Sequence, residues 1–420
     1  MIDVGSTMIK SVVFSADGEI DQGFHARKPD KSIVEQVDEL AADWAAQTPA
    51  PRNAGPEIRI CSSANKGLRV GIVCVSSRYS GAATAHCLET VGSNIVYLHE
   101  ARDPPPNPPP HVDVLAVVGG VDAYPSGAMT AALEAMDLDA WPQDKLIFAG
   151  HKDCWDWVQR SWPTANLVAN PLQNGLVPQN MALADLVRET YLDDIESKRE
   201  LRPLKSRTER PIEPTPAIVS RAFQRLIDNR RAPDLLLDVG GATTDIHYTK
   251  ELFDDDADSA ALATHQPVGR YVYTGYGVYE SRTSTIDALL NHHQAQDFLT
   301  ALYGNRHRQI FVDLLEHVIA DDLLFYACIF LALSNLSEAK RSGNTKDGTG
   351  APPLNLQRAV TLGITGGAAK NTKIAELKRV LTVATGARIE PILDAQYRWW
   401  TLGLLDGPEL ENMQWDIFDV

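Results

Sequence analysis

The sequence predicts an α/β protein built from two related halves, with a further α/β unit inserted into the first half. Two observations indicate this. A strand, an Asp-x-Gly turn and a returning strand occur twice, at Asp3 and at Asp238, near the start of each half. Between them, residues 69–180 alternate apolar runs with helical stretches, a pattern typical of a parallel sheet with helical crossovers.

The first 68 residues form the first part of domain I in this prediction. A β-meander covers 1–30, with a hairpin turn at Asp17-Gly18. The apolar spacing over 31–46 predicts a helix, and a strand follows at 58–61.

The inserted unit spans 69–180 and is expected to be doubly wound. Its predicted strands are 70–75, 94–98, 113–118, 145–149 and 166–169, and its predicted helices include 81–91 and 127–136. The proline-rich run 103–110 is expected to form a surface loop.

Residues 181–233 are expected to be a helical connection and linker, and residues 234–420 a second domain. In that domain we expect a long helical region over 311–341 and a final α/β piece over 359–405. The linker's last helix, 216–230, leads into the second Asp-x-Gly turn.

The composition excludes several classes of function. Hydrophobic residues make up 44% of the 420, enough for packed cores. Asp plus Glu exceed Lys plus Arg by 55 to 39, a net charge of −16, so no nucleic-acid partner is expected. No apolar run approaches the roughly 18 residues of a membrane span.

The cysteines and the N-terminus suggest a cytoplasmic protein. Five scattered cysteines without a Cys-x-x-Cys pair predict neither a disulfide framework nor a zinc knuckle. The N-terminus has no basic segment followed by an apolar stretch, so no signal peptide is expected. Whether Met1 is the natural start stays open.

The first Asp-x-Gly turn carries phosphate-binding chemistry. Gly5 permits a tight turn whose backbone N–H groups cradle phosphate oxygens, and Ser6, Thr7 and Lys10 add donors. A carboxylate at Asp3, beside those phosphates, would hold Mg²⁺, mostly through water.

The second turn repeats this pattern. Asp238 ends an apolar strand, Gly240 and Gly241 form the turn, and Thr243 and Thr244 lead into the returning strand. Two such loops could clamp a triphosphate and its magnesium, and close on it.

A third glycine-rich unit, 363–371, follows a predicted strand. Gly366 and Gly367 would let a base or ribose lie against the backbone. Each unit alone is common in ordinary hairpins and loops. All three in this order predict ATP and Mg²⁺ binding.

The three units resemble the phosphate 1, phosphate 2 and adenosine motifs of the actin/Hsp70/sugar-kinase fold, which has duplicated ribonuclease H-like domains. Within it, the chain is similar to glutamate mutase accessory proteins, the MutL/GlmL family, which is unrelated to the mismatch-repair protein. The collinear stretches that carry the resemblance are Asp3–Lys10, Cys61–Arg69, Val117–Asp122, Ile147–Lys152, Asn170–Asn180, Asp238–Asp245 and Gly363–Gly367.

The resemblance implies a weak, chaperone-like ATPase that maintains an adenosylcobalamin-dependent mutase, with ATP driving release of damaged cobalamin. Asp3 and Asp238 would position magnesium. The residues that would hold phosphates are Gly5, Ser6, Thr7, Lys10, Gly240, Gly241, Thr243 and Thr244, and Gly366 and Gly367 would hold adenosine. Asp245 or Asp122 would orient the attacking water, and Asp245 fits equally a turn carboxylate that caps backbone N–H groups.

The implied partners are mutase subunits and ATP or ADP, with no membrane, and a homodimer stays open. One stretch departs from the family. Tyr273-Thr-Gly-Tyr-Gly-Val278 stands where members tend to carry Glu-Gly-Asp-Leu-Gly, so hydrolysis is expected to be altered or slow if that acidic stretch helps catalysis.

The inserted unit resembles a cobalamin-binding domain in its strand–helix alternation but lacks an Asp-x-His-x-x-Gly ligand motif. We therefore expect it to dock a partner. Three alternatives stay open: a small-molecule kinase, a non-hydrolysing assembly protein switched by nucleotide, and an electron-transferring activator. The last needs clustered cysteines for an iron–sulfur centre, which this chain lacks.

Overall fold

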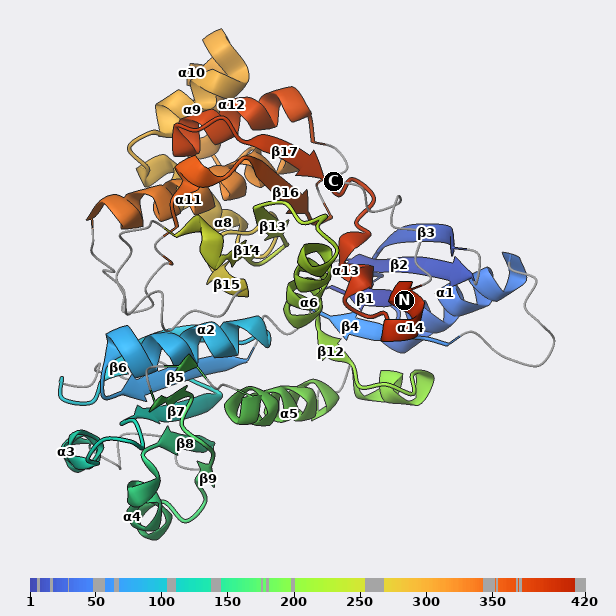
Figure 1. Ribbon diagram of the computed structural model, residues 1–420. Helices are drawn as coiled ribbons and strands as arrows, with labels where there is room; N and C mark the ends of the chain where they lie inside the picture. Colours follow the sequence, from blue (N-terminus) through green and yellow to red (C-terminus); the bar gives the residue numbers. More distant parts are fainter. Residues whose placement is uncertain are drawn as a thin grey trace. The chain divides into compact units, whose positions relative to one another are not determined.

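The structure is a computed structural model (Figure 1). It describes residues 1–5, 8–15, 18–28, 30–47, 57–63, 68–103, 111–136, 145–174, 177–178, 181–197, 201–253, 268–342, 352, 354–367, 369 and 372–411. Contacts divide the chain into two units. Unit 1 comprises Met1–Gly67, Arg188–Ala232 and Gln396–Val420, and unit 2 comprises Leu68–Val187 and Pro233–Ala395.

A five-stranded mixed sheet forms the centre of unit 1. Its strands are β1 (Ile2–Val4), β2 (Met8–Ser15), β3 (Gly18–Ala26), β4 (Ile60–Ser62) and β12 (Glu213–Pro214), in the order β12-β4-β1-β2-β3. The first three strands are antiparallel neighbours, and β4 runs parallel to both β1 and β12. The predicted meander is confirmed, with Ser15 opposite Gly18 at the hairpin, while Asp17 lies outside the described residues.

Helices from three parts of the chain complete unit 1. They are α1 (Ile33–Gln47), α5 (Met181–Ser197, shared with unit 2), the 3₁₀ segment η5 (Arg202–Arg207), α6 (Thr215–Asp228), α13 (Trp399–Leu402) and α14 (Gly407–Glu411). A capping box starts α1, in which the Ser32 amide and hydroxyl bind the Glu35 carboxylate and the Glu35 amide binds the Ser32 hydroxyl. Where α6 meets α13, Gly403 is needed, since a Cβ there would lie 2.1 Å from the Ile218 carbonyl oxygen.

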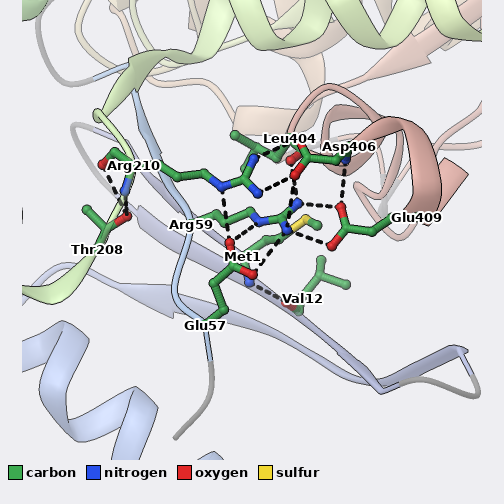
Figure 2. A network of polar contacts seen from close by, with 9 residues as sticks. All are labelled: Met1, Val12, Glu57, Arg59, Thr208, Arg210, Leu404, Asp406 and Glu409. Carbon is green, nitrogen blue, oxygen red and sulfur yellow. Dashed lines mark hydrogen bonds and ion pairs between the residues drawn. The ribbon is translucent and has the colours of Figure 1, made fainter. Parts of the chain in front are cut away.

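Charged contacts tie the end of the chain to the start of β4 (Figure 2). The Arg59 side chain, 6% exposed, donates two 2.6 Å bonds to Glu409 and one of 2.7 Å to the Leu404 carbonyl. Arg210 binds Asp406 and Glu57 beside it. Multiple charge-assisted bonds on one buried guanidinium give this junction a defined geometry.

The central sheet of unit 2 repeats the topology of the first. Its strands are β13 (Leu235–Val239), β14 (Thr244–Thr249), β15 (Val268–Tyr273), β16 (Thr361–Thr365) and β17 (Glu390–Leu393), in the order β15-β14-β13-β16-β17. Three antiparallel strands again come first in sequence, and two parallel strands follow on the other side of the first strand. The predicted α/β fold class with duplicated halves is therefore confirmed.

Helices and short 3₁₀ segments pack with this sheet. They are η6 (Lys250–Leu252), α8 (Arg282–Asn291), α9 (Ala295–Tyr303), η7 (Gly304–Arg306), α10 (His307–Leu315), α11 (Asp321–Ser342), η8 (Leu356–Arg358) and α12 (Ile374–Thr385). Residues 323–333 of α11 are all buried and form the centre of the core. The single helical region expected over 311–341 is wrong, because the chain breaks at 316–320, where His317 adopts a left-handed φ of 56°.

Residues 69–167 of unit 2 form a separate, fully parallel sheet. Its strands are β5 (Arg69–Cys74), β6 (Asn94–Glu100), β7 (Val114–Gly119), β8 (Leu146–Gly150) and β9 (Asn166–Leu167), in the order β6-β5-β7-β8-β9. Connecting and following elements are η1 (Ser77–Gly81), α2 (Ala82–Thr90), α3 (Gly127–Ala135), η3 (Lys152–Cys154), α4 (Trp155–Ser161) and the hairpin β10 (Leu172–Gln173) to β11 (Val177–Pro178). The parallel sheet is as expected, and the doubly wound arrangement stays a prediction.

The domain boundaries taken from the sequence also stay a prediction. The proline-rich residues 104–110 lie outside the described residues. No helix within the described ranges is long and apolar enough to cross a membrane. No disulfide links the five cysteines, which are all buried.

Within unit 2, α2 packs against β15, and a buried charge lies where they meet. Arg270 on β15, 1% exposed, donates to the backbone carbonyls of Glu89 at 2.6 Å and Ser93 at 3.2 Å. The Glu89 side chain is itself buried. Burial raises its pKa to about 8, against the opposing effect of the Arg270 charge, and the Asp245 charge adds to the rise.

Glu89→Gln is expected to change how stability depends on pH. A raised pKa means that the folded protein holds this proton between about pH 4.5 and 8 while the unfolded chain releases it, so stability falls as pH rises through that window. The variant should lose this dependence, on the order of a few kcal/mol, and be the more stable protein at pH 8. Urea unfolding from pH 5 to 8 measures this.

The control is Glu134→Gln, which alters an exposed glutamate on α3. It should follow the parent protein at every pH. An unchanged pH dependence in Glu89→Gln would show that Glu89 ionises normally in the fold.

Candidate functional site

The turn between β1 and β2, which we call loop 1 (Asp3–Met8), is closed by one backbone bond. The Gly5 amide donates to the Met8 carbonyl at 2.9 Å. A Cβ at Gly5 would lie 2.9 Å from that same oxygen, so the turn needs glycine. Ser6 and Thr7, both predicted phosphate ligands, lie outside the described residues.

Asp3, at the end of β1, is fully buried among donors. Its Oδ1 accepts from the Thr215 hydroxyl at 2.6 Å and from the Cys61 thiol at 3.7 Å. Its Oδ2 accepts from Lys10 Nζ at 3.1 Å and from the Tyr397 hydroxyl at 3.2 Å. Burial, and then the charge of Asp3, raise the pKa of Cys61 well above its ordinary value, so the thiol stays protonated.

Lys10 is therefore held between a carboxylate and a ring. Its ammonium nitrogen lies 3.8 Å from the centre of the Tyr397 ring as well as bonding to Asp3. Cation–π contact and ion pair together orient the Lys10 side chain beside loop 1. Asp3, Gly5 and Lys10 thus lie together, as the sequence predicted.

Loop 2 (Asp238–Thr243) repeats the geometry of loop 1. The Gly240 amide donates to the Thr243 carbonyl at 2.9 Å, again from the residue two positions after the aspartate to the residue three further on. In the strand register Asp3 faces Lys10, and Asp238, which is half-buried, faces Asp245. The duplication therefore extends to single backbone bonds.

Residues 277–281 lie directly against loop 2. The amides of Val278, Tyr279 and Glu280 donate to the carbonyls of Gly240 and Gly241, at 2.8–3.1 Å. The Ser281 hydroxyl donates to the Ala242 carbonyl at 2.6 Å. These bonds hold the carbonyl groups of loop 2, while within the described ranges the amides of residues 241–243 donate no hydrogen bond.

The stretch that departs from the family pattern is thus part of this site. The Tyr273 and Tyr276 rings stack at 5.0 Å, and the Tyr276 hydroxyl accepts from Asn335 at 2.5 Å. The predicted phosphate ligand Thr244 is buried, and its hydroxyl donates to the Tyr276 carbonyl at 2.9 Å. The two stacked tyrosine rings thus belong to the segment whose Val278 amide bonds to loop 2.

Asp245 forms a buried ion pair. The Arg270 guanidinium donates to its Oδ1 through Nε at 2.9 Å and through Nη2, and the Thr243 hydroxyl donates to Oδ2 at 3.1 Å. Asp245 is 4% exposed. The contact is neither of the two roles considered from the sequence, and the water-orienting role of Asp245 stays a prediction.

The third glycine unit lies beside loop 2. Strands β13 and β16 run parallel, with Asp238 opposite Thr365. Gly366, with a φ of 118°, approaches Val239 so closely that a Cβ would lie 2.3 Å from its carbonyl oxygen. Gly366 therefore lies next to the end of the strand that carries Asp238, and the adenosine-binding role of Gly366 and Gly367 stays a prediction.

Other stretches that carry the family resemblance meet at the carboxyl edge of the parallel sheet formed by β5 to β9. The His151 amide donates to the Gly119 carbonyl at 2.9 Å, and the Asn170 side chain donates to the carbonyls of Gly119 and Gly120. The Lys152 amide donates to Asp122 at 3.0 Å. Asp122 thus lies at this edge, in contact with the loop that follows β8.

Unit 1 also contains a cavity of about 170 Å³, lined by residues that include Arg59, Arg210, Arg221 and Arg225. None of the predicted site residues lines it. Glu213 and Asp406, also in the lining, bind Arg221 and Arg210. Since internal carboxylates already pair with these guanidinium groups, the cavity is not assigned to the nucleotide.

Several residues of the site were not predicted from the sequence. Thr215 and Tyr397 lie 212 and 394 residues from the Asp3 that they contact. Arg270 lies in a strand with no motif around it. No local pattern could have found these partners, because each reaches its aspartate only through the folding of another element of the chain.

Comparison with solved structures finds distant similarities. The activator of 2-hydroxyisocaproyl-CoA dehydratase from Clostridium difficile with bound ADPNP is 9% identical, with 100% of this chain and 97% of that chain covered and a TM-score of 0.32. The ATP-dependent caprolactamase from Pseudomonas jessenii is 17% identical, with 96% and 70% covered and a TM-score of 0.35. The ethanolamine utilization protein EutJ from Carboxydothermus hydrogenoformans is 10% identical, with 96% and 86% covered and a TM-score of 0.31. These low scores carry no conclusion beyond the strand topology described above.

The family comparison is more specific. No curated protein matches the chain. The family model described as "MutL protein" matches residues 1–334 of the 420, a range that includes loop 1, the parallel sheet and loop 2. The chain therefore belongs to the MutL protein family.

Proposed function

We propose that this protein binds ATP with Mg²⁺ and acts as an accessory, reactivating protein for an adenosylcobalamin-dependent mutase such as glutamate mutase. The observation that carries the ATP proposal is the duplicated Asp-x-Gly turn, in which Gly5 bonds to Met8 and Gly240 bonds to Thr243 at the same 2.9 Å. Membership of the MutL family supports the accessory role.

The geometry of loop 2 supports phosphate binding. Its carbonyl groups are held by residues 278–281, and the consecutive amides of residues 241–243 remain to bind anionic oxygens. Consecutive backbone N–H groups in a turn form an anion-binding concavity. In unit 1, Lys10 would supply a positive charge to a phosphate.

The donor atoms fit magnesium unevenly. Asp238 is half-buried at a strand end and offers hard oxygen atoms of the kind that Mg²⁺ prefers. Asp3 is fully buried among four donors, so in this conformation it fits better as the group that orients Lys10. When bound, the ion would neutralise charge on the phosphates.

The adenosine would lie on Gly366 and Gly367, since this unit neighbours loop 2 through the parallel pairing of β13 and β16.

Slow hydrolysis is expected. An aromatic stretch contacts loop 2, and Asp245, one candidate to orient water, is paired with Arg270. The rate of phosphoryl transfer comes mainly from positioning and charge. The acidic stretch that family members tend to carry is replaced here by Tyr273–Val278, and the loss of its carboxylates is therefore expected to slow hydrolysis.

The pairing of Asp245 with Arg270 also favours one alternative function, that of a protein that uses nucleotide only as a switch for assembly. In either version the parallel-sheet segment 69–180 would dock the partner in the cytoplasm, and ADP would be the product or the competing ligand. Purified protein with Mg-ATP distinguishes the two versions. Hydrolysis that rises when a mutase is added supports reactivation, and nucleotide binding without hydrolysis supports the switch.

Gly277→Ala is expected to weaken Mg-ATP binding at least tenfold. A Cβ there would lie 2.5 Å from the Gly241 carbonyl oxygen and 2.6 Å from the Ala242 carbonyl carbon, so loop 2 must move. Gly275→Ala, in the same stretch, is the matched control, because its nearest neighbour would be a side-chain oxygen 4.0 Å away. Titration calorimetry measures both, with urea unfolding as a check on folding. Equal affinity for the two variants would contradict the role of loop 2.

Asp238→Asn should reduce magnesium-dependent ATP turnover by about tenfold or more, while nucleotide affinity changes less, because a neutral amide is a poor magnesium ligand. Asp287→Asn, at an exposed site on α8, serves as control. Single-turnover assays across magnesium concentrations separate the two effects. Unchanged turnover in Asp238→Asn would remove this residue from the proposed site.

A further inference from the structure

Three potential metal ligands meet in the helical part of unit 2. His292 and His293 directly follow α8, and Glu338 lies on α11. Glu338 Oε1 is 3.5 Å from His292 Nε2 and 3.5 Å from His293 Nδ1. One donor atom from each residue falls within 4.8 Å of the other two. Neither the nucleotide loops nor the parallel sheet includes these residues.

His292 is held with its free nitrogen directed at this point. Its side chain is 8% exposed, and its ring lies edge-on against Phe330 and stacks on His293, both at 4.8 Å. Among the described residues, His292 Nε2 and Glu338 Oε1 have no hydrogen-bond partner. Buried polar atoms without partners are costly and rare, so this pair calls for a ligand.

We propose that His292 Nε2, His293 Nδ1 and Glu338 Oε1 bind one divalent transition-metal ion, of which Zn²⁺ is the best fit. Two imidazoles and a carboxylate are a donor set of zinc and non-haem iron sites, whereas Mg²⁺ and Ca²⁺ prefer oxygen ligands throughout. The fourth position would hold water.

The spacing suits a small ion. Ligand atoms about 2.0–2.2 Å from a tetrahedral zinc ion are roughly 3.4 Å from one another. The two 3.5 Å separations already match this value. His293, whose side chain is 67% exposed, can turn to shorten the third.

Binding requires a change at His292. The Gln294 amide donates to His292 Nδ1 at 3.2 Å, which places the ring proton of the metal-free protein on Nε2. To bind metal, the neutral ring must carry that proton on Nδ1 and give up the Gln294 contact. The proton moves within the ring, and the number of protons bound by the ring is unchanged. The ion would then fasten the end of α8 to α11.

The test uses untagged full-length protein freed of metal with a chelator. Co²⁺ is titrated as a probe, with visible d–d absorption reporting low coordination number, and Zn²⁺ competition and calorimetry give stoichiometry. We expect one site per chain, and a melting temperature that rises with Zn²⁺ in excess. His293→Asn and Glu338→Gln alter partly exposed side chains and should each weaken binding at least tenfold.

His317→Asn is the control, because this histidine is exposed and asparagine tolerates its left-handed backbone. It should bind the metals as the parent protein does. Absence of Co²⁺ and Zn²⁺ binding, or full binding by both ligand variants, would overturn the proposal and leave a simple histidine–glutamate contact. The outcome does not depend on Mg-ATP, so it is separable from the proposed function.

Discussion

Each half of this protein depends on one backbone hydrogen bond of 2.9 Å. Its donor is the amide of the glycine two residues after the aspartate, Gly5 or Gly240, and its acceptor is the carbonyl of the residue three positions after that glycine, Met8 or Thr243. The bond closes the turn between two antiparallel strands and brings the backbone so near that a Cβ at Gly5 or Gly240 would lie within 3.3 Å of that oxygen. Because the turn sits at the end of the central strand of each sheet, its position is set by a neighbouring strand on either side. A turn closed by such a bond at the end of a buried strand is a suitable place for anion-binding amides.

The two halves then use different means to hold the residues around this turn. In unit 1 a fully buried aspartate accepts hydrogen bonds from four residues, the nearby Lys10 and the distant Cys61, Thr215 and Tyr397. In unit 2 the residue opposite the aspartate is itself acidic, and Arg270 neutralises it. A buried carboxylate without a partner would be strongly destabilising, so each arrangement is constrained as a set.

Arg270 also connects β14, the strand that follows loop 2, to α2, since it binds Asp245 on β14 and the Glu89 carbonyl at the end of α2. A change in the position of α2 would therefore act on the strand that carries Asp245. In the proposed function this gives a physical route between a docked partner and the nucleotide, through one guanidinium group. The proposed metal site would stabilise another part of unit 2, the end of α8. This helix begins directly after residues 277–281, which lie against loop 2.

The sequence by itself determined the two turns, their order, the parallel segment between them and the glycines of the third unit. These are local patterns: a turn that needs glycine, and strand–helix alternation, are written in neighbouring residues. Even the stretch Tyr273–Val278 stood out before its position against loop 2 was known.

Tertiary structure alone decided which groups surround the turns. Thr215 reaches Asp3 from the first turn of α6, Tyr397 reaches Asp3 from a much later part of the chain, and Arg270 reaches Asp245 from the neighbouring strand β15. The break before α11 follows from a left-handed residue within an apolar pattern that favours a continuous helix. Burial and charge pairing are properties of the assembled sheets. They depend on contacts between residues that lie from 25 to 394 positions apart, which no local spacing encodes.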